Sequence, residues 1–415
     1  MCSSSSSSMP RAEKKGLGWL EWLRGWLYIV YEMLFQRIAA SNIPNPLPLS
    51  PLPDLTCIVT GATSGIGLEI ARQLAESGAH VVMAVRNPKA AHDLIKKWQD
   101  NLCATGVPLN VEVMELDLLS LESVVRFAEA WNARSAPLNV LINNAGIFSI
   151  GVCMVLDLLV LVQSPIFSGG KMHFVGFVDT EDMNVVSGKR KYSSLVGYSS
   201  SKLAQVMFNS IFHKRIPAEA GINVVCVSPG MVHTNVARDL PKIVQAAYHL
   251  IPYFIFSAEE GSRSALFAAT DDQVPEYCGL LKADEWPVCA FISHDCRPMN
   301  ASEEAHNVPT SQKVWEKTLE MIGLPLDAVE RLLEGDQVFM ISALMPHIDG
   351  QRNGVVIPSA NHSPTTDQNR YKDVPDHGLI DATATFISAT VAYMIEPDRQ
   401  VKLSPFRSAS ESGPQ

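Results

Sequence analysis

Several features that define large protein classes are absent from this sequence. There is no excess of positive charge, since the formal net charge is −10 over 415 residues, and this excludes the basic surface that nucleic-acid binding needs. The eight cysteines form neither a CxxC pair nor a regular framework, which excludes a disulfide scaffold and predicts reduced thiols in a cytosol-facing compartment. No group of cysteines and histidines has the spacing of a common metal site. The sequence therefore predicts no nucleic-acid partner and no bound metal.

The N-terminal region lacks an apolar stretch of the length that a membrane-spanning helix requires. Residues 1–16 are polar and of low complexity, and we expect them to be disordered. Residues 17–41 predict an amphipathic helix instead, because charged residues interrupt the apolar ones. The apolar face comprises Trp19, Trp22, Leu23, Trp26, Leu27, Val30 and Leu34, and the opposite face carries Glu21, Arg24, Tyr28 and Glu32.

The sequence of this helix is compatible with two locations, a membrane interface and the surface of the protein itself. Its tryptophans and the basic residues before it favour peripheral contact of residues 18–38 with a membrane interface, whereas the simpler alternative packs the helix on the protein's own surface. Residues 42–53 are rich in proline and predict a linker that holds the helix away from the rest of the protein. This linker favours the membrane, and we expect a cytosol-facing protein on the endoplasmic reticulum or another endomembrane.

From about residue 54, short apolar strands alternate with amphipathic helices. This alternation continues to about residue 335 and predicts an α/β domain with a doubly wound parallel sheet of Rossmann type, covered by helices on both faces. Residues 336–415 contain few periodic segments, and we expect them to form a poorly ordered tail.

A glycine-rich turn, TGATSGIG at residues 60–67, connects the first strand of this domain to its first helix. Gly61 permits the tight turn, whereas Gly65 and Gly67 let the backbone approach a pyrophosphate and let the helix pack closely. The amides of the turn and the helix N-terminus then hold the phosphates. The strand–turn–helix context favours a dinucleotide site over an ordinary turn. Its candidate residues are Gly61, Thr63, Ser64, Gly65, Ile66 and Gly67.

Four further motifs follow in order along the chain. They are Asp117 after the third strand, Asn143-Asn144-Ala145-Gly146 after the fourth, the YxxxK pair Tyr198 and Lys202, and Pro229-Gly230 with Val232 and Thr234. Together with the glycine turn, this ordered set resembles the short-chain dehydrogenase/reductase superfamily, and within it the retinol-dehydrogenase-like branch. The resemblance implies that Asp117 contacts adenine, that the NNAG stretch closes over the cofactor, and that the Pro229-Gly230 stretch holds its nicotinamide end. It also implies a homo-oligomer, because family members commonly form dimers or tetramers.

The YxxxK spacing has a physical reason, since residues four apart lie on one face of a helix. Tyrosine has a pKa of about 10 and is a poor acid at neutral pH, and a nearby ammonium favours its phenolate. The resemblance implies that Tyr198 exchanges the proton at the carbonyl or alcohol oxygen. It also implies that Lys202 lowers the pKa of Tyr198 and binds the nicotinamide ribose.

Acidic residues are missing at the end of the second strand, where NAD-binding proteins place an Asp or Glu on the ribose hydroxyls. Arg86 occupies that position. A guanidinium is a bidentate donor that suits a 2′-phosphate and stacks on adenine. We therefore predict that the cofactor is NADP.

The segment between the NNAG stretch and the YxxxK tyrosine is too short for what the resemblance requires. Residues 147–172 contain one apolar run, 152–162, which can serve as the crossover helix or as the fifth strand, but hardly as both. We therefore expect an incomplete crossover between the fourth and fifth strands. The resemblance puts a catalytic serine three residues before His173, where this chain has Gly170. Ser168 is the nearest substitute hydroxyl and the third candidate catalytic residue.

These features together predict an NADP-dependent oxidoreductase. It would move a hydride between nicotinamide and a small apolar carbonyl or alcohol, and the short segment would impair it. A second class stays open, namely an NADP-binding regulatory protein that has lost turnover. Both bind the nucleotide, and only the enzyme converts a substrate.

Overall fold

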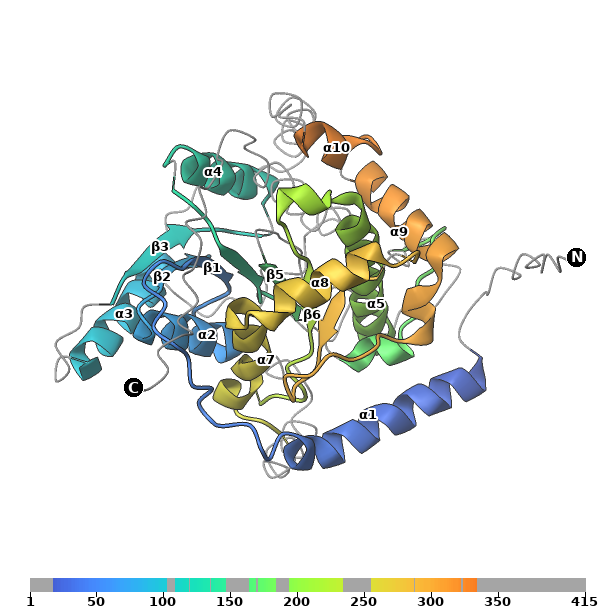
Figure 1. Ribbon diagram of the computed structural model, residues 1–415, viewed down its shortest axis with the longest axis horizontal. Coiled ribbons are helices and arrows are strands. Elements are labelled where there is room, and N and C mark those ends of the chain that lie inside the picture. Colours follow the sequence, from blue (N-terminus) through green and yellow to red (C-terminus); the bar gives the residue numbers. More distant parts are fainter. Residues whose placement is uncertain are drawn as a thin grey trace, which may run out of the picture.

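The computed structural model describes residues 18–102, 109–118, 120–134, 136–146, 164–168, 171–183, 194–233, 255–286, 288–321 and 324–333. The strands are β1 (Thr56–Thr60), β2 (His80–Val85), β3 (Val111–Glu115), β4 (Val140–Asn143), β5 (Ser164–Ser168), β6 (Val225–Val227) and β7 (Ala290–Ile292). The α-helices are α1 (Trp19–Ala39), α2 (Gly65–Glu76), α3 (Pro88–Leu102), α4 (Leu121–Asn132), α5 (Ser194–Arg215), α7 (Ala258–Thr270), α8 (Gln273–Ala283), α9 (Val308–Met321) and α10 (Ala328–Leu333) (Figure 1). Short 3₁₀ helices are η1 (Lys171–Val175), η2 (Ala218–Ala220) and η4 (Glu303–His306).

The seven described strands form one parallel sheet in the order β3-β2-β1-β4-β5-β6-β7. Strands β2 and β3 are added on one side of β1, and strands β4 to β7 are added on its other side. The direction in which strands are added therefore reverses between β1 and β4. Ligands of doubly wound folds bind outside the carboxyl ends of the strands at such a reversal. The predicted doubly wound sheet of Rossmann type is confirmed, and it brings the glycine turn after β1 next to the NNAG stretch after β4.

Alternate residues along each strand face opposite layers of helices, because strand side chains alternate between the two faces of a sheet. On one face, Val59 of β1 belongs to a core with Leu74 of α2. On the other face, Ile58 of β1 joins Trp131 of α4, and Phe291 of β7 joins the buried side chains of α5 and α9. Strands that are buried on both faces have near-continuous apolar sequences, which is why the sequence pattern located the first four strands and β6.

Strand β5 fills the place of the fifth strand that the short segment put in doubt. It pairs in parallel with β4 from Val140↔Ser164 to Asn143↔Phe167, and with β6 on its other side. The strand follows the apolar run 152–162, so that run is not the fifth strand. Whether the run forms the crossover helix concerns residues 147–163, which lie outside the described residues.

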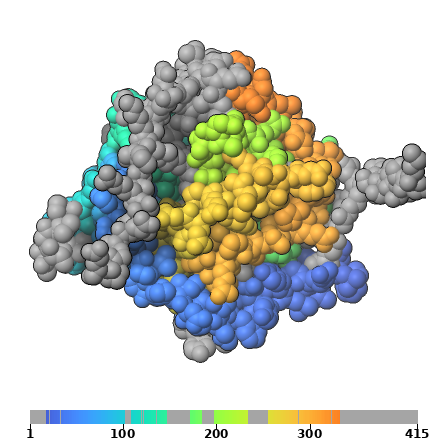
Figure 2. All heavy atoms as spheres, in the orientation of Figure 1, coloured from blue at the N-terminus to red at the C-terminus, as the bar shows by residue number. Residues whose placement is uncertain are grey.

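Helix α1 lies along one side of the body (Figures 1 and 2). Gly25 packs so closely that an added Cβ would lie 2.7 Å from the carbonyl oxygen of Phe174. Further along the helix, Ile29 and Gln36 are buried. The leucines of the proline-rich stretch 42–53 pack against the core that α2 covers. Contrary to expectation, this stretch therefore does not hold the helix away from the body. Its leucines pack on the core because the burial of apolar side chains lowers the free energy of the folded chain.

The side of α1 that faces the body is the side that its sequence marks as polar. Tyr28 packs on Phe174 with ring centroids 4.5 Å apart, and Glu32 Oε2 lies 3.9 Å from His294 Nδ1. Most of the predicted apolar face points outward instead. Its exposed side chains and their large apolar neighbours are Trp19, Leu20, Trp22, Leu23, Leu27, Val30, Tyr31, Leu34, Phe35 and Ile38. Among the described residues, no helix has both the length and the apolarity to cross a membrane.

Candidate active site

The turn between β1 and α2 leads into a helix N-terminus without a side-chain cap. Gly61 and Gly65 have φ angles of 65° and 60°, in the left-handed region that glycine adopts without strain. Ser64 is the N-cap residue of α2, and its side chain makes no capping hydrogen bond. The first turn of the helix also carries no acidic side chain. An uncapped helix N-terminus without negative charge suits a phosphate group, so the residues of this turn fit the pyrophosphate of a dinucleotide.

Thr60 ties this turn to the NNAG stretch after β4. Its hydroxyl oxygen accepts hydrogen bonds from the backbone amides of Asn144 and Ala145, both at 3.1 Å. The side-chain amide of Asn144 donates to the Thr60 carbonyl oxygen, also at 3.1 Å. An added Cβ at Gly67 would lie 2.2 Å from Asn144 Nδ2. Gly67 is therefore needed for the approach of Asn144, a reason that the motif alone does not reveal.

Arg86 and Asp117 follow the neighbouring strands at the same edge of the sheet. The backbone amide of Gly61 donates to a carbonyl of β2 at 3.1 Å, and that of Leu116 donates to the last carbonyl of β2 at 2.9 Å. These bonds join the carboxyl ends of β1, β2 and β3. Arg86 is exposed there and Asp117 is half-buried. The Asp117 amide donates to the Ser123 hydroxyl at 2.9 Å, which fixes the backbone of the aspartate.

Tyr198 and Lys202 lie one turn apart on α5, as their spacing predicts. The Lys202 Nζ is 5.3 Å from the centroid of the Tyr198 ring. Lys202 is only 1% exposed, and burial lowers its pKa to about 7, against a smaller opposing effect of the Cys226 thiol. The side chain of Tyr198 is half-buried. A lysine that titrates near neutral pH thus lies against the ring of the candidate proton donor.

The stretch that begins at Pro229 follows β6 and turns sharply at Gly230, whose φ is 78°. Val232 forms a parallel β-bridge to the segment that leads into α7. Gly261 of α7 packs so tightly on Val232 that an added Cβ would lie 2.6 Å from Val232 Cγ2. Helix α7 therefore holds this stretch beside the sheet. Thr234, the last candidate residue of this motif, lies outside the described residues.

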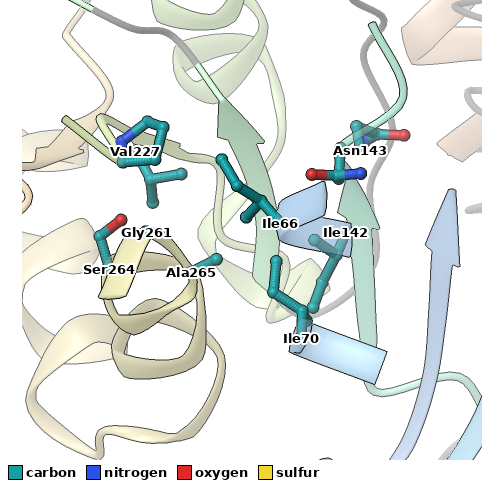
Figure 3. Close-up of a pocket in the computed structure, with 10 residues that line it drawn as sticks. Ile66, Ile70, Ile142, Asn143, Val227, Gly261, Ser264 and Ala265 are labelled. Atoms are coloured by element: carbon teal, nitrogen blue, oxygen red, sulfur yellow. The ribbon is translucent and has the colours of Figure 1, made fainter. Parts of the chain in front are cut away.

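A cavity of about 10 Å³ lies below the glycine turn, between α2 and α7. Figure 3 shows Ile66, Ile70 and Ile142 on one side of it and the α7 residues on the other. A volume of this size holds about one water molecule, so the cavity belongs to the packed floor of the site. The full lining is Ile66, Ile70, Ile142, Asn143, Asn144, Val227, Pro229, Gly261, Ser264 and Ala265. Sequence reasoning missed the contribution of α7, because no motif marks it.

The third candidate catalytic residue is described only by its backbone. Ser168 is the last residue of β5, and its Cα is in register with Val227 of β6. Its position is therefore at the carboxyl edge of the sheet, while its side chain and residues 169–170 lie outside the described part. His173 is fully buried, and its Nε2 accepts the backbone amide of Ser302 at 3.1 Å. This hydrogen bond ties η1 to the residue that precedes η4.

Comparison with known proteins places these features in one family. The family model for short chain dehydrogenases matches residues 55–159. The dehydrogenase/reductase SDR family member FEY of Arabidopsis thaliana is 59% identical over 361 residues, which cover 81% of this chain and 96% of FEY. The chain belongs to the short-chain dehydrogenase/reductase family. This confirms the resemblance that the ordered motifs indicate, and it extends to the plant FOREVER YOUNG oxidoreductases, of which FEY is one.

A second curated protein and a solved structure are also similar to the chain, at lower identity. Retinol dehydrogenase 11 of Mus musculus is 27% identical over 322 residues, which cover 72% of this chain and 93% of that protein. A crystal structure of an uncharacterized protein from Mycobacterium Paratuberculosis is 25% identical, with a TM-score of 0.47, and covers 68% of this chain and 96% of its own.

As a short-chain dehydrogenase/reductase, the chain is an NAD(P)-dependent oxidoreductase. The match to the family model ends at residue 159, inside the short segment 147–172. The glycine turn, Asp117 and the NNAG stretch fall within that match. Strand β5, the YxxxK pair and the Pro229-Gly230 stretch come after it.

Proposed function

We propose that the chain is an NADP-dependent oxidoreductase that acts on a small apolar carbonyl or alcohol. The observation that carries this proposal is the pair on α5, in which the buried Lys202 Nζ lies 5.3 Å from the centroid of the Tyr198 ring. A lysine whose pKa is about 7 favours the phenolate of a neighbouring tyrosine while it is protonated. Such a tyrosine is a competent proton donor and acceptor at neutral pH.

The chain's own residues divide the chemistry between them. When bound, NADP(H) supplies or accepts the hydride. In the direction of reduction, the Tyr198 hydroxyl donates its proton to the carbonyl oxygen of the substrate, and in oxidation the phenolate takes a proton from the alcohol. Lys202 lowers the pKa of Tyr198 and holds the nicotinamide ribose. Ser168, at the end of β5, is the nearest hydroxyl to the position of the family's serine and substitutes for it only in part, because it lies two residues before that position.

The cofactor residues follow the carboxyl edge of the sheet. The glycine turn, with its uncapped helix N-terminus, binds the pyrophosphate. Arg86 binds the 2′-phosphate as a bidentate donor, which is the reason for NADP over NAD. Asp117 contacts adenine, and the NNAG stretch closes over the dinucleotide. The nicotinamide end rests on Pro229, Gly230, Val232 and Thr234.

A second candidate function is a regulatory protein that binds NADP without turnover. The observation in its favour is that Gly170 stands where the resemblance puts the catalytic serine, three residues before His173. The family match also ends before this position, at residue 159. A substrate oxygen that lacks one hydrogen bond in such a site loses on the order of 10²–10³ in rate. Slow turnover is therefore expected even of the enzyme, and the two proposals differ in whether any turnover that depends on Tyr198 occurs.

The test uses the purified full-length protein. NADPH and NADH binding are measured by fluorescence titration, and a series of aldehydes, ketones and alcohols of increasing chain length is then assayed with each cofactor. We expect tighter binding of NADPH, and slow turnover that rises with the apolar length of the substrate. In Tyr198→Phe, binding stays unchanged and turnover disappears. NADPH binding with no turnover that depends on Tyr198 favours the regulatory protein, and failure to bind either cofactor contradicts both candidates.

The outward face of α1 supports peripheral membrane contact as part of this function. Trp19, Trp22 and Leu27 are exposed on a helix whose opposite side is already held by the body. Tryptophan and leucine at that position suit the headgroup region of a bilayer, where an apolar substrate also concentrates. We propose a cytosol-facing location on the endoplasmic reticulum or another endomembrane, and a homo-oligomer in solution, which light scattering of the purified protein tests.

A further inference from the structure

The side chain of Gln36 pairs with the backbone of a residue 195 positions away. The backbone amide of Met231 donates to Gln36 Oε1 at 2.8 Å, and Gln36 Nε2 donates to the Met231 carbonyl oxygen at 3.1 Å. Gln36 is only 2% exposed. One amide side chain thus satisfies both polar groups of one peptide residue, in the way that a neighbouring strand satisfies them in a sheet.

Met231 directly follows Gly230 in the stretch proposed for the nicotinamide end. An added Cβ at Gly230 would lie 2.8 Å from Gln36 Oε1 and 3.1 Å from the ring of Phe256. Gly230 is therefore required both by its φ of 78° and by the presence of Gln36 beside it. Only a residue without a Cβ leaves room for the Gln36 side chain at this turn.

The next residue of α1, Arg37, binds the segment that enters α7, which lies beside Met231. The guanidinium of Arg37 donates to the Ile255 carbonyl oxygen at 2.7 Å and forms an ion pair with Glu260 at 2.8 Å. The Phe256 amide in turn donates to the Met231 carbonyl oxygen at 2.9 Å. The last turn of α1 therefore holds both the stretch that leaves β6 and the segment that enters α7 (Figure 1).

We propose that Gln36 is a positioning residue for the nicotinamide end of the cofactor, so that the N-terminal helix is part of the cofactor site. This inference rests on the proposed NADP-dependent function. Gln36 touches neither cofactor nor substrate and acts through the backbone of Met231. Without it, the part-buried amide of Met231 loses its acceptor, and the stretch moves to find another, because a donor shielded from water is costly to leave unpaired.

The test compares two ligands that reach different distances into the site. NADPH extends to the nicotinamide end, whereas 2′,5′-ADP occupies only the adenine half. Gln36→Met keeps the length of the side chain and removes both hydrogen bonds, and Gln36→Asn keeps the amide but is one methylene too short. Ile29→Ala is the matched control, since Ile29 is buried on the same side of α1 two turns earlier and lies away from Met231 in the helix.

We expect both Gln36 variants of the full-length protein to bind NADPH about 10-fold more weakly and to bind 2′,5′-ADP as the parent does. Any turnover falls by about the same factor or more, because a misplacement of about 1 Å costs up to ~10²-fold. Ile29→Ala lowers the unfolding temperature and leaves the ratio of the two affinities unchanged.

Three outcomes separate the two proposals. If the parent binds NADPH and the Gln36 variants bind it equally well, the positioning role is wrong and the proposed function stands. If the Gln36 variants and Ile29→Ala weaken both ligands alike, the helix acts through general stability and the positioning role is again wrong. If the parent binds neither NADPH nor 2′,5′-ADP, the proposed function fails together with this inference.

Discussion

The two halves of the site are built in different ways. The adenine half, from the glycine turn to Asp117, comes from three consecutive strands and the turns after them. The catalytic half joins β4, β5, α5 and the stretch after β6, and α1 holds it from a distance of 195 residues along the chain. Apart from the contacts of Thr60 and Gly67 with Asn144, the adenine half depends on turns within a few residues of each strand end. The catalytic half depends on parts that meet only after folding, so a short segment between β4 and α5 acts directly on it.

The largest effect is expected when the short segment of the catalytic half is replaced by a segment of full length. Replacing residues 147–172 with a complete crossover helix and a strand that ends in serine should raise NADPH oxidation on the order of 10²–10³-fold, because it restores one hydrogen bond to the substrate oxygen. The binding of NADPH should change little, because the adenine half is untouched. Equal, brisk rates in parent and replacement would contradict the prediction and would assign the hydroxyl role to Ser168 or a neighbour.

The adenine half is tested by a single charge at the end of β2. Arg86→Asp should shift the ratio of NADPH to NADH affinity by about 10–10²-fold towards NADH, since a charge-assisted hydrogen bond contributes about 1.5–3 kcal/mol. Lys97→Asp makes the same change of charge at an exposed position on α3 and serves as control. The measurement is the dissociation constant of each cofactor by fluorescence titration. A parent with equal constants for the two cofactors would argue against the role of Arg86.

The buried lysine of the catalytic half predicts a dependence of stability on pH. Burial lowers the pKa of Lys202 from 10.5 to about 7, so between these values the unfolded chain binds more protons than the folded one. The free energy of unfolding should therefore rise with pH from about 7 to 10, by up to about 1.4 kcal/mol per pH unit from this residue. Below pH 7 both states are protonated and the contribution is constant.

Lys202→Met isolates this contribution in denaturant unfolding at pH 7, 8 and 9 without cofactor. The slope of stability against pH should decrease in the variant relative to the parent. Parallel slopes in the two proteins would show that burial does not lower the pKa of Lys202.

The smallest expected effect concerns the outward face of α1. Leu27→Gln should lower the partition coefficient onto lipid vesicles about 5-fold, because burying part of a leucine in the interface contributes about 1 kcal/mol. Leu326→Gln is a matched control, since Leu27 is 61% exposed and Leu326 is 52% exposed but lies before α10. Flotation with vesicles of zwitterionic lipid measures both. Equal partition of the parent and the two variants would leave the outward face without a membrane role.

Individual residues show why prediction worked better for one half than for the other. The roles of Gly61 and Gly65 follow from a motif of eight residues, because positive φ angles after a strand are local properties. The Tyr198 and Lys202 pair follows from the period of a helix. Gln36, by contrast, is one glutamine in an amphipathic helix, and no pattern in the sequence connects it to Met231. Strand β5 also escapes prediction, because segment 147–172 is short and the five residues of the strand, which include a proline, carry little periodic signal.

The sequence by itself determined the order of strands and helices, the glycine turn, the spacing of the catalytic pair and the two faces of α1, because these depend on neighbours within a few residues. Only the tertiary structure decided which face of α1 meets the body. The polar face docks because Met231, Ile255 and Glu260 offer partners for Gln36 and Arg37. Folding also decided the burial of Lys202 and the need for glycine at position 67, since both depend on side chains that arrive from distant strands.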